Sequence, residues 1–329
     1  MVLDEPAPAD TAPLAPVERD TPDPGADEVV LEVGACGVCR TDLQLVEGDL
    51  PARRLPVVPG PQVVGRIVAT GEAVEDREAV KHVGVAWIAS VCGTCRFCRS
   101  GRENLCESAT FTGWDRDGGY ADRVTARAEF TYPLPEAVDD LALAPLLCGG
   151  VIGYRCLEVA GVEPGDRLGL YGFGASASLV IQVARHWDCE VYVATRDERE
   201  QERARSMGAV WAGHYDETPP EPLDEAITFA PVGDVVVDAL RAVDRGGVVA
   251  VNAIHLDRIP EFPYEQLWWE RSIRSVANVT RANVTDFLAV AAEVPVTTAA
   301  VPYPLEQAND HASAIFGPGT WAQHGRAPP

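Results

Sequence analysis

The chain has 329 residues, 47% of them hydrophobic and 23% charged, which suffices for two folded domains and excludes a disordered chain. Its formal net charge of −23 argues against nucleic acid and anionic membrane surfaces as partners, because both would repel it. Neither a basic, apolar leader nor a run of roughly 18 apolar residues occurs, so we expect a cytoplasmic protein without a membrane segment.

The first third of the chain is predicted to be β structure broken by Pro- and Gly-containing turns, with strands over 28–36, 63–71 and 83–89. From about Gly165 the pattern changes to alternating strands and helices, which is typical of parallel strands joined by crossover helices. The segments are 166–174, a helix over 178–187, 190–195, a charged helix over 197–208, and two apolar segments over 235–243 and 246–254. After Thr285 we expect an amphipathic helix over 286–294, a β-like segment over 297–305 and a weakly ordered tail from Gly317.

Four cysteines lie within fifteen residues, in a C-x2-C-x2-C-x7-C run formed by Cys92, Cys95, Cys98 and Cys106. Close spacing lets backbone turns aim four thiolates at one tetrahedral zinc ion, which stabilises the fold and leaves no room for a substrate. An iron–sulfur cluster or a set of disulfides is the alternative. The spacing favours a structural zinc.

Segments on both sides of this run resemble those of the zinc-dependent alcohol dehydrogenases in the medium-chain dehydrogenase/reductase superfamily. GACGVCRTDL, VVPGPQVVGRIV and APLLCGGVIGYRCL are similar to the family's three catalytic-zinc segments, and GLYGFGASASLVIQVAR and VYVATR to its cofactor-binding turn and the next strand. The resemblance runs from about Val2 to about Phe316. It implies a GroES-like catalytic domain with the structural zinc lobe over 1–149, a Rossmann-type doubly wound nucleotide-binding domain over 150–284, and a return to the catalytic domain with a tail over 285–329. The active site would lie between the two domains.

The catalytic-zinc segments depart from the family pattern. One Cys, one His and a second Cys hold that zinc in the family, and the resemblance places the two cysteines at Cys39 and Cys148. The histidine of the family's Gly-His-Glu triplet is replaced by Pro61, which has no donor atom, and the following carboxylate by Gln62. The resemblance therefore predicts an incomplete catalytic zinc site. Asp42, which supports the histidine in the family, would have a free carboxylate for a rescued site.

The family's proton relay is also altered. The family passes a proton from the alcohol through a hydroxyl and the cofactor ribose to a surface histidine. Thr41 keeps the hydroxyl, but Gln44 stands at the histidine position and cannot titrate near neutral pH. We interpret Cys36 as a packing residue, and His82 as a loop residue rather than a replacement ligand.

The cofactor site is predicted where the strand RLGLY ends in a glycine-rich turn and a helix begins, because such a turn lets a pyrophosphate meet helix N-terminal amides. Its residues are Gly172, Gly174, Ala175 and Ser176. The next strand ends in Thr195 and Arg196, whose hydroxyl and guanidinium suit a 2′-phosphate and favour NADP(H). Asp197 and Glu198 are the argument for NAD(H).

Three hypotheses follow. The first is a reductase that transfers hydride from a nicotinamide cofactor to a small-molecule substrate without a catalytic zinc. The second is a zinc alcohol dehydrogenase whose metal site is rescued by Asp42 or water. The third is a cofactor-binding protein with a scaffold or non-redox role. In each case we expect a homo-oligomer.

Overall fold

The structure, a computed structural model, describes residues 1–75, 81–294 and 296–309. The tail expected from Gly317 and part of the segment before the third expected strand lie outside the described residues. The chain divides into two compact units. Unit 1 comprises 1–148, 280–285 and the residues from 297 onward, and unit 2 comprises 149–279 and 286–296. The division differs from the expected domains in assigning Gly149 and 286–296 to unit 2 and 280–284 to unit 1.

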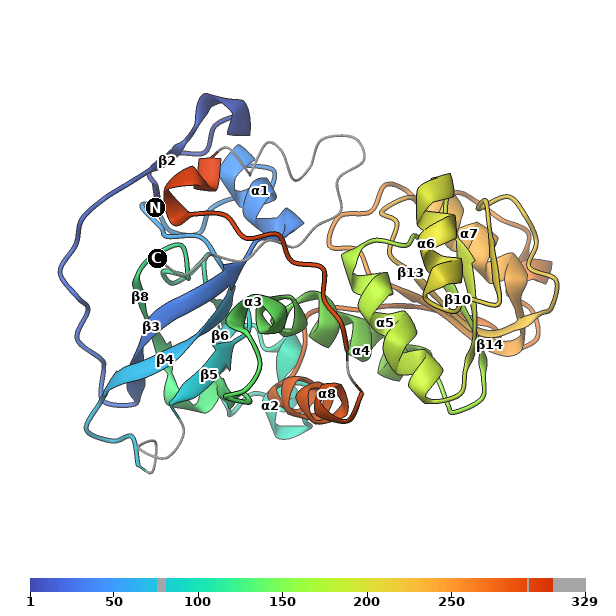
Figure 1. The fold of residues 1–329 in the computed structure, drawn as a ribbon. Helices are drawn as coiled ribbons and strands as arrows, with labels where there is room; N and C mark the ends of the chain where they lie inside the picture. The colour runs from blue at the N-terminus through green and yellow to red at the C-terminus, as the bar shows by residue number, and fades with distance from the viewer. Residues whose placement is uncertain (76–80, 295, 310–329) are drawn as a thin grey trace. The chain divides into compact units, whose positions relative to one another are not determined.

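Unit 1 is built on a five-stranded antiparallel sheet with the order β8-β3-β4-β5-β9 (Figure 1). Its strands are β3 (Glu28–Gly37), β4 (Gln62–Thr70), β5 (His82–Val85), β8 (Arg123–Arg127) and β9 (Thr131–Pro133). The third expected strand is two strands, because the chain turns after β5 and continues as β6 (Ile88–Ser90), which pairs with β7 (Thr110–Phe111). The remaining elements are β1 (Val2–Leu3), β2 (Leu14–Ala15), α1 (Arg40–Glu47), α2 (Arg96–Arg99), α3 (Asp140–Leu143) and the 3-10 helices η1 (Ala9–Thr11), η2 (Glu103–Leu105), η3 (Ala128–Phe130), η4 (Ala144–Leu147) and η6 (Leu305–Gln307).

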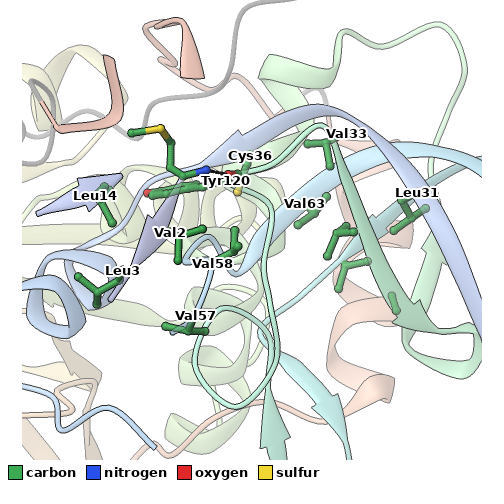
Figure 2. Close-up of a cluster of buried hydrophobic side chains, with 14 of the residues drawn as sticks. Val2, Leu3, Leu14, Leu31, Val33, Cys36, Val57, Val58, Val63 and Tyr120 are labelled. Atoms are coloured by element: carbon green, nitrogen blue, oxygen red, sulfur yellow. Dashed lines mark hydrogen bonds between the residues drawn. The ribbon is translucent and has the colours of Figure 1, made fainter. Parts of the chain in front are cut away.

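The core of unit 1 forms where apolar side chains of β3 and β4 meet those of the N-terminal segment (Figure 2). Cys36 and Tyr120 are 4% and 5% exposed and lie side by side in it. Both come within contact distance of a Cβ built at Gly60, whose φ of +101° is a conformation that favours glycine. Cys36 is therefore a core residue, in agreement with its interpretation as packing.

Unit 2 is a six-stranded parallel sheet with the order β12-β11-β10-β13-β14-β15. The chain runs outward from β10 through β11 to β12 and then crosses back to β13, so the strand order reverses between β10 and β13. In open α/β sheets, ligands bind beyond the carboxyl ends of the strands at such a point. The strands are β10 (Arg167–Tyr171), β11 (Glu190–Ala194), β12 (Trp211–Gly213), β13 (Leu223–Thr228), β14 (Val243–Val251) and β15 (Ser272–Ser275), with helices α4 (Gly149–Ala160), α5 (Ala175–His186), α6 (Glu198–Ser206) and α7 (Gly233–Ala242), the 3-10 helix η5 (Tyr264–Gln266) and, partly in unit 1, α8 (Arg281–Glu293).

The segment expected to be β-like over 297–305 is not a strand, although the structure describes all of it. Thr298 instead donates its hydroxyl to the carbonyl of Ala142 at 3.1 Å. Ala300 and Tyr303 form only isolated β-bridges, so the alternation of apolar residues there does not produce a continuous strand.

One stretch, Asp140–Ala160, is long and apolar enough to cross a membrane by length and composition alone. In the structure it is three separate elements, and 61% of its most apolar window is buried inside the protein. Its apolar character is explained by packing within the two units.

Glu225 in β13 predicts how the stability of unit 2 depends on pH. Burial, the charge of Asp166 and a hydrogen bond with it raise the pKa of Glu225 from 4.5 to about 8. The folded state therefore keeps a proton that the unfolded chain releases near 4.5, so stability falls as pH rises from 4.5 to about 8. Glu225→Gln, which mimics the protonated acid, should stabilise the protein at pH 8.5 by roughly 2 kcal/mol, a figure reduced for partial exposure, and have little effect at pH 4.5. Guanidinium unfolding at both pH values measures this, and equal shifts at both would contradict it.

Candidate functional site

The four cysteines of the run meet at one point of unit 1. Their Sγ atoms all lie within 4.8 Å of one another, with 3.5 Å between Cys95 and Cys98 and 3.9 Å between Cys92 and Cys98. With Zn–S bonds of about 2.3 Å, two thiolates on a tetrahedral zinc are roughly 3.8 Å apart. Backbone amides of Thr94 and Cys95 also donate to the Cys92 Sγ and lower its pKa to about 6. The four side chains therefore fit a zinc ion, and all are free thiols rather than disulfides.

An ionic contact ties this lobe to the start of α8 within unit 1. Glu103, which lies in the run between Cys98 and Cys106, accepts from the Arg281 backbone amide at 2.7 Å and from its guanidinium at 2.8–3.2 Å. Arg281 also donates to Glu129 at 2.7 Å and lies over the Phe130 ring. Bidentate pairs of this kind fix orientation as well as adding energy. The sequence analysis missed this pair, because nothing in the spacing links Glu103 to Arg281.

The structure brings Cys39 and Cys148 together, as the resemblance implies. A hydrogen bond between their thiols, burial and the charge of the second thiol raise the pKa of Cys39 well above its usual value. Cys39 directly precedes α1, and Cys148 directly follows η4. Two sulfur ligands are thus placed in one part of unit 1.

Asp42 does not offer a free carboxylate, contrary to the expectation for a rescued zinc site. One carboxylate oxygen accepts from the Cys39 amide at 2.8 Å, and the other accepts from the Gly60 amide at 3.1 Å. Burial and the nearby Cys39 raise the pKa of Asp42 well above its usual value. This carboxylate joins two backbone segments, the start of α1 and the loop at Gly60, as is expected of a buried carboxylate whose oxygens are hydrogen-bonded.

No third ligand accompanies the two thiols in the part of the chain that the structure describes. Pro61 is buried and has no donor atom. Among the described residues, only the four-cysteine cluster brings three or more His, Cys, Asp or Glu side chains within reach of one metal ion. Catalytic zinc sites have three protein ligands, so the residues around Cys39 and Cys148 do not fit one.

The other positions singled out in this region fall on ordered structure. Thr41 and Gln44 lie partly buried on α1. His82 is the first residue of β5 and is buried, so its interpretation as a loop residue is wrong. Its Nε2 lies 2.9 Å from an Asp140 carboxylate oxygen and its Nδ1 lies 3.1 Å from the Pro135 carbonyl. Both ring nitrogens of His82 therefore contact other residues of unit 1.

The predicted glycine-rich turn joins β10 to α5 in unit 2. Gly172 has a φ of +92°, and a Cβ there would come within 3.0 Å of the Ala230 amide nitrogen, so only glycine fits without strain. Gly174 directly precedes α5, and the partly buried Ala175 and Ser176 begin it. Small residues before a helix N-terminus fit a cofactor pyrophosphate.

A residue that the sequence analysis missed supports this turn from α6. The Arg203 guanidinium donates to the carbonyls of Phe173 and Gly174 at 3.1 and 3.3 Å and lies over the Phe173 ring. Burial lowers the pKa of Arg203 relative to an exposed arginine. The spacing of charges in α6 gives no signal for this contact, because it depends on how the helix packs.

At the end of β11, Thr195 and Arg196 have different surroundings. Thr195 is 1% exposed and donates its hydroxyl to Glu200, so the expected use of that hydroxyl on a 2′-phosphate is wrong. Arg196 is exposed. Tyr215, which follows β12, hydrogen bonds Thr195 and lies within electrostatic range of Arg196. Asp197 caps α6 by accepting from the Arg199 amide at 2.8 Å.

Comparison with known proteins assigns these features to one family. Residues 25–136 match the alcohol dehydrogenase GroES-like domain. The chain is 47% identical over 310 residues to the probable alcohol dehydrogenase AdhA of Mycobacterium tuberculosis, covering 92% of this chain and 90% of that protein. The chain belongs to the zinc-dependent alcohol dehydrogenase family of medium-chain dehydrogenases. It is also 36% identical over 215 residues to the aldehyde reductase AdhA of Synechocystis, covering 65% and 63% of the two proteins.

The fold agrees with the family. The cinnamyl alcohol dehydrogenase SbCAD4 of Sorghum bicolor superposes with a TM-score of 0.87 at 24% identity, covering 97% of this chain and 95% of that one. The GroES-like domain and the parallel-sheet domain of the Rossmann type are thereby confirmed. As a family member, the chain is an alcohol dehydrogenase-like oxidoreductase.

Proposed function

We propose that the chain uses NAD(P)H to reduce a small carbonyl compound without a catalytic zinc. The observation that carries the proposal is the pair of thiols at Cys39 and Cys148 with Pro61 in place of the third ligand. The carboxylate of Asp42 is committed to the amides of Cys39 and Gly60, which argues against a rescued site. Reduction of a polar double bond needs only a placed hydride donor and acceptor and a source of a proton.

In this proposal, residues of unit 2 bind the cofactor and residues of unit 1 position α1. The nicotinamide cofactor, when bound, supplies the hydride. Gly172, Gly174 and the start of α5 would hold its pyrophosphate, and Arg203 fixes the turn that presents them. In unit 1, Asp42 holds α1, which carries Thr41, against the loop at Gly60. Gln44 cannot relay a proton, so the proton comes from water.

Metal content and cofactor oxidation test the proposal. The purified chain should hold about one zinc, bound by the four-cysteine cluster, and should oxidise NADPH with a panel of aldehydes, ketones, imines and enones. About two zinc per chain with oxidation of simple alcohols would favour the zinc-dependent alternative instead. One zinc and no oxidation of NADPH across the panel would favour the non-redox alternative.

We further propose a preference for NADP(H), supported by the exposed Arg196 beyond β11 and by the use of Asp197 as a helix cap. Arg196→Ala should weaken NADPH binding by about 1.5 to 3 kcal/mol, the usual contribution of a hydrogen bond to a charged group, and leave NADH nearly unchanged. Fluorescence titration with each cofactor measures the difference. Arg99→Ala, which removes an exposed arginine of unit 1, is the matched control. An equal loss for both cofactors from Arg196→Ala would show that its guanidinium does not reach the 2′-phosphate.

A further inference from the structure

Gln62 is a fully buried amide whose polar atoms have no hydrogen-bond partner among the described residues. Its side chain is 0% exposed, and neither Oε1 nor Nε2 is paired. A buried polar group without a partner lowers stability, and nearly all such groups in proteins are paired. The folded protein would be more stable with a well-packed apolar side chain at this position. The presence of an amide there therefore indicates that it binds a ligand.

The backbone beside Gln62 is shaped to admit the amide. Gln62 begins β4 and pairs with Gly37 at the end of β3. A Cβ at position 37 would lie 2.6 Å from the Gln62 Oε1 and 2.9 Å from its Cδ, closer than atoms pack. Glycine at this position therefore lets the amide lie against the strand, two residues before Cys39.

The groups around this position are mostly acceptors or acids. Cys36 Sγ hydrogen bonds the backbone of Gln62, and its pKa is raised by burial and by the charges of Asp42 and Cys39. Each oxygen of Asp42 accepts from a backbone amide, one from Cys39 and the other from Gly60. The Gln62 amide is thus an unpaired neutral donor among the described residues, and its strand partner Gly37 lies two residues before Cys39.

We propose that Gln62 binds the reacting oxygen of the substrate. Its Nε2 donates to the oxygen of a carbonyl compound, and its Oε1 accepts from the hydroxyl of the corresponding alcohol, so one amide recognises both sides of the reaction. A fixed donor in a water-excluded site stabilises negative charge as it develops on that oxygen. The inference rests on the proposed function, because a catalytic zinc would itself take this oxygen.

Gln62→Leu tests the proposal with two readouts that move in opposite directions. The melting temperature should rise, because two unpaired polar atoms are removed from the interior at similar volume. The kcat/KM for NADPH oxidation with butanal or benzaldehyde should fall about 100-fold, as for loss of one such donor. Binding of benzyl alcohol to the wild-type protein with NADP, followed by saturation-transfer NMR, should be lost in the variant.

Tyr120→Phe is the matched control, because the Tyr120 hydroxyl is another buried polar atom of unit 1 without a partner among the described residues. It lies in the apolar core with Val2 and Leu14 (Figure 2). This variant should also melt at a higher temperature, but with kcat/KM and benzyl alcohol binding unchanged. The pair of variants separates the removal of an unpaired polar atom from the loss of a substrate contact.

Gln62→Glu adds a pH signature that a structural role would not produce. Only the protonated carboxyl can donate to a carbonyl oxygen, so kcat/KM of this variant should fall with rising pH, on a limb that the wild type lacks. The proposal is overturned if Gln62→Leu keeps wild-type kcat/KM and benzyl alcohol binding, or if it lowers the melting temperature. A wild-type protein with about one zinc and unchanged kinetics in Gln62→Leu would refute this inference alone. About two zinc in the wild type would refute the proposed function as well.

Discussion

Cys95→Ser is expected to remove the zinc from the four-cysteine cluster and to leave little folded protein. A structural zinc site contributes its binding free energy to folding, and the loss of one thiolate should cost roughly 5 kcal/mol, comparable to the whole stability of many domains. The closeness of the four Sγ atoms, all within 4.8 Å, places Cys95 among the ligands. The measurements are zinc content by elemental analysis, soluble yield and circular dichroism.

The loss of structure in Cys95→Ser should extend from the four-cysteine cluster to the start of α8, because Glu103 lies in the same loop and pairs with Arg281. The cofactor affinity of any folded fraction should be unchanged, since the glycine-rich turn belongs to unit 2. Cys189→Ser is the matched control: its thiol lies outside the cluster and donates to the Glu163 carbonyl, which a hydroxyl can also do. Full zinc content and normal yield in Cys95→Ser would show that Cys95 is not a ligand.

The regular elements were predictable where the periodicity of the sequence matches burial. The strands at β3 and β4 and the helix α5 appear within a few residues of their expected places, because apolar residues recur there at the period of each element. β13 was not predicted, because its residues Leu223–Thr228 include two carboxylates. One of them, Asp224, pairs with Arg167 across the sheet, a contact between segments distant in sequence.

Some features of the candidate site could also be predicted from the sequence, and others could not. The four-cysteine cluster follows from local spacing, whereas the meeting of Cys39 and Cys148 required the family resemblance. The bond between Cys39 and Asp42 is a local helix cap. The bond of Asp42 to the Gly60 amide and that of the Thr195 hydroxyl to Glu200 could not be predicted, because each depends on how a helix packs against another segment. The unpaired amide of Gln62 is visible only once its burial is known.

Restoring the family's third ligand should restore a second zinc. The variant combines Pro61→His and Gln62→Glu, with Gln44→His added for the proton relay. The two thiols already lie together, and Asp42 already holds Gly60, the residue before the new imidazole. Three protein ligands meet the requirement of a catalytic zinc, and zinc content should rise from about one to about two per chain.

Alcohol oxidation should appear in the triple variant once the second zinc is bound. The triple variant is expected to oxidise simple alcohols at a rate that rises with pH, because a zinc-bound alcohol ionises more readily than a free one. Pro61→Ala is the control, since it removes the proline's restriction of the backbone without adding a donor atom, and it should keep about one zinc. Metal content is measured before activity, on folded protein. A folded triple variant that still holds only one zinc would show that unit 1 has diverged around Cys39 and Cys148 as well as at the three changed positions. That result would count against the zinc-dependent alternative, whereas the zinc-free reductase and the non-redox alternative need no second zinc and are separated by NADPH oxidation.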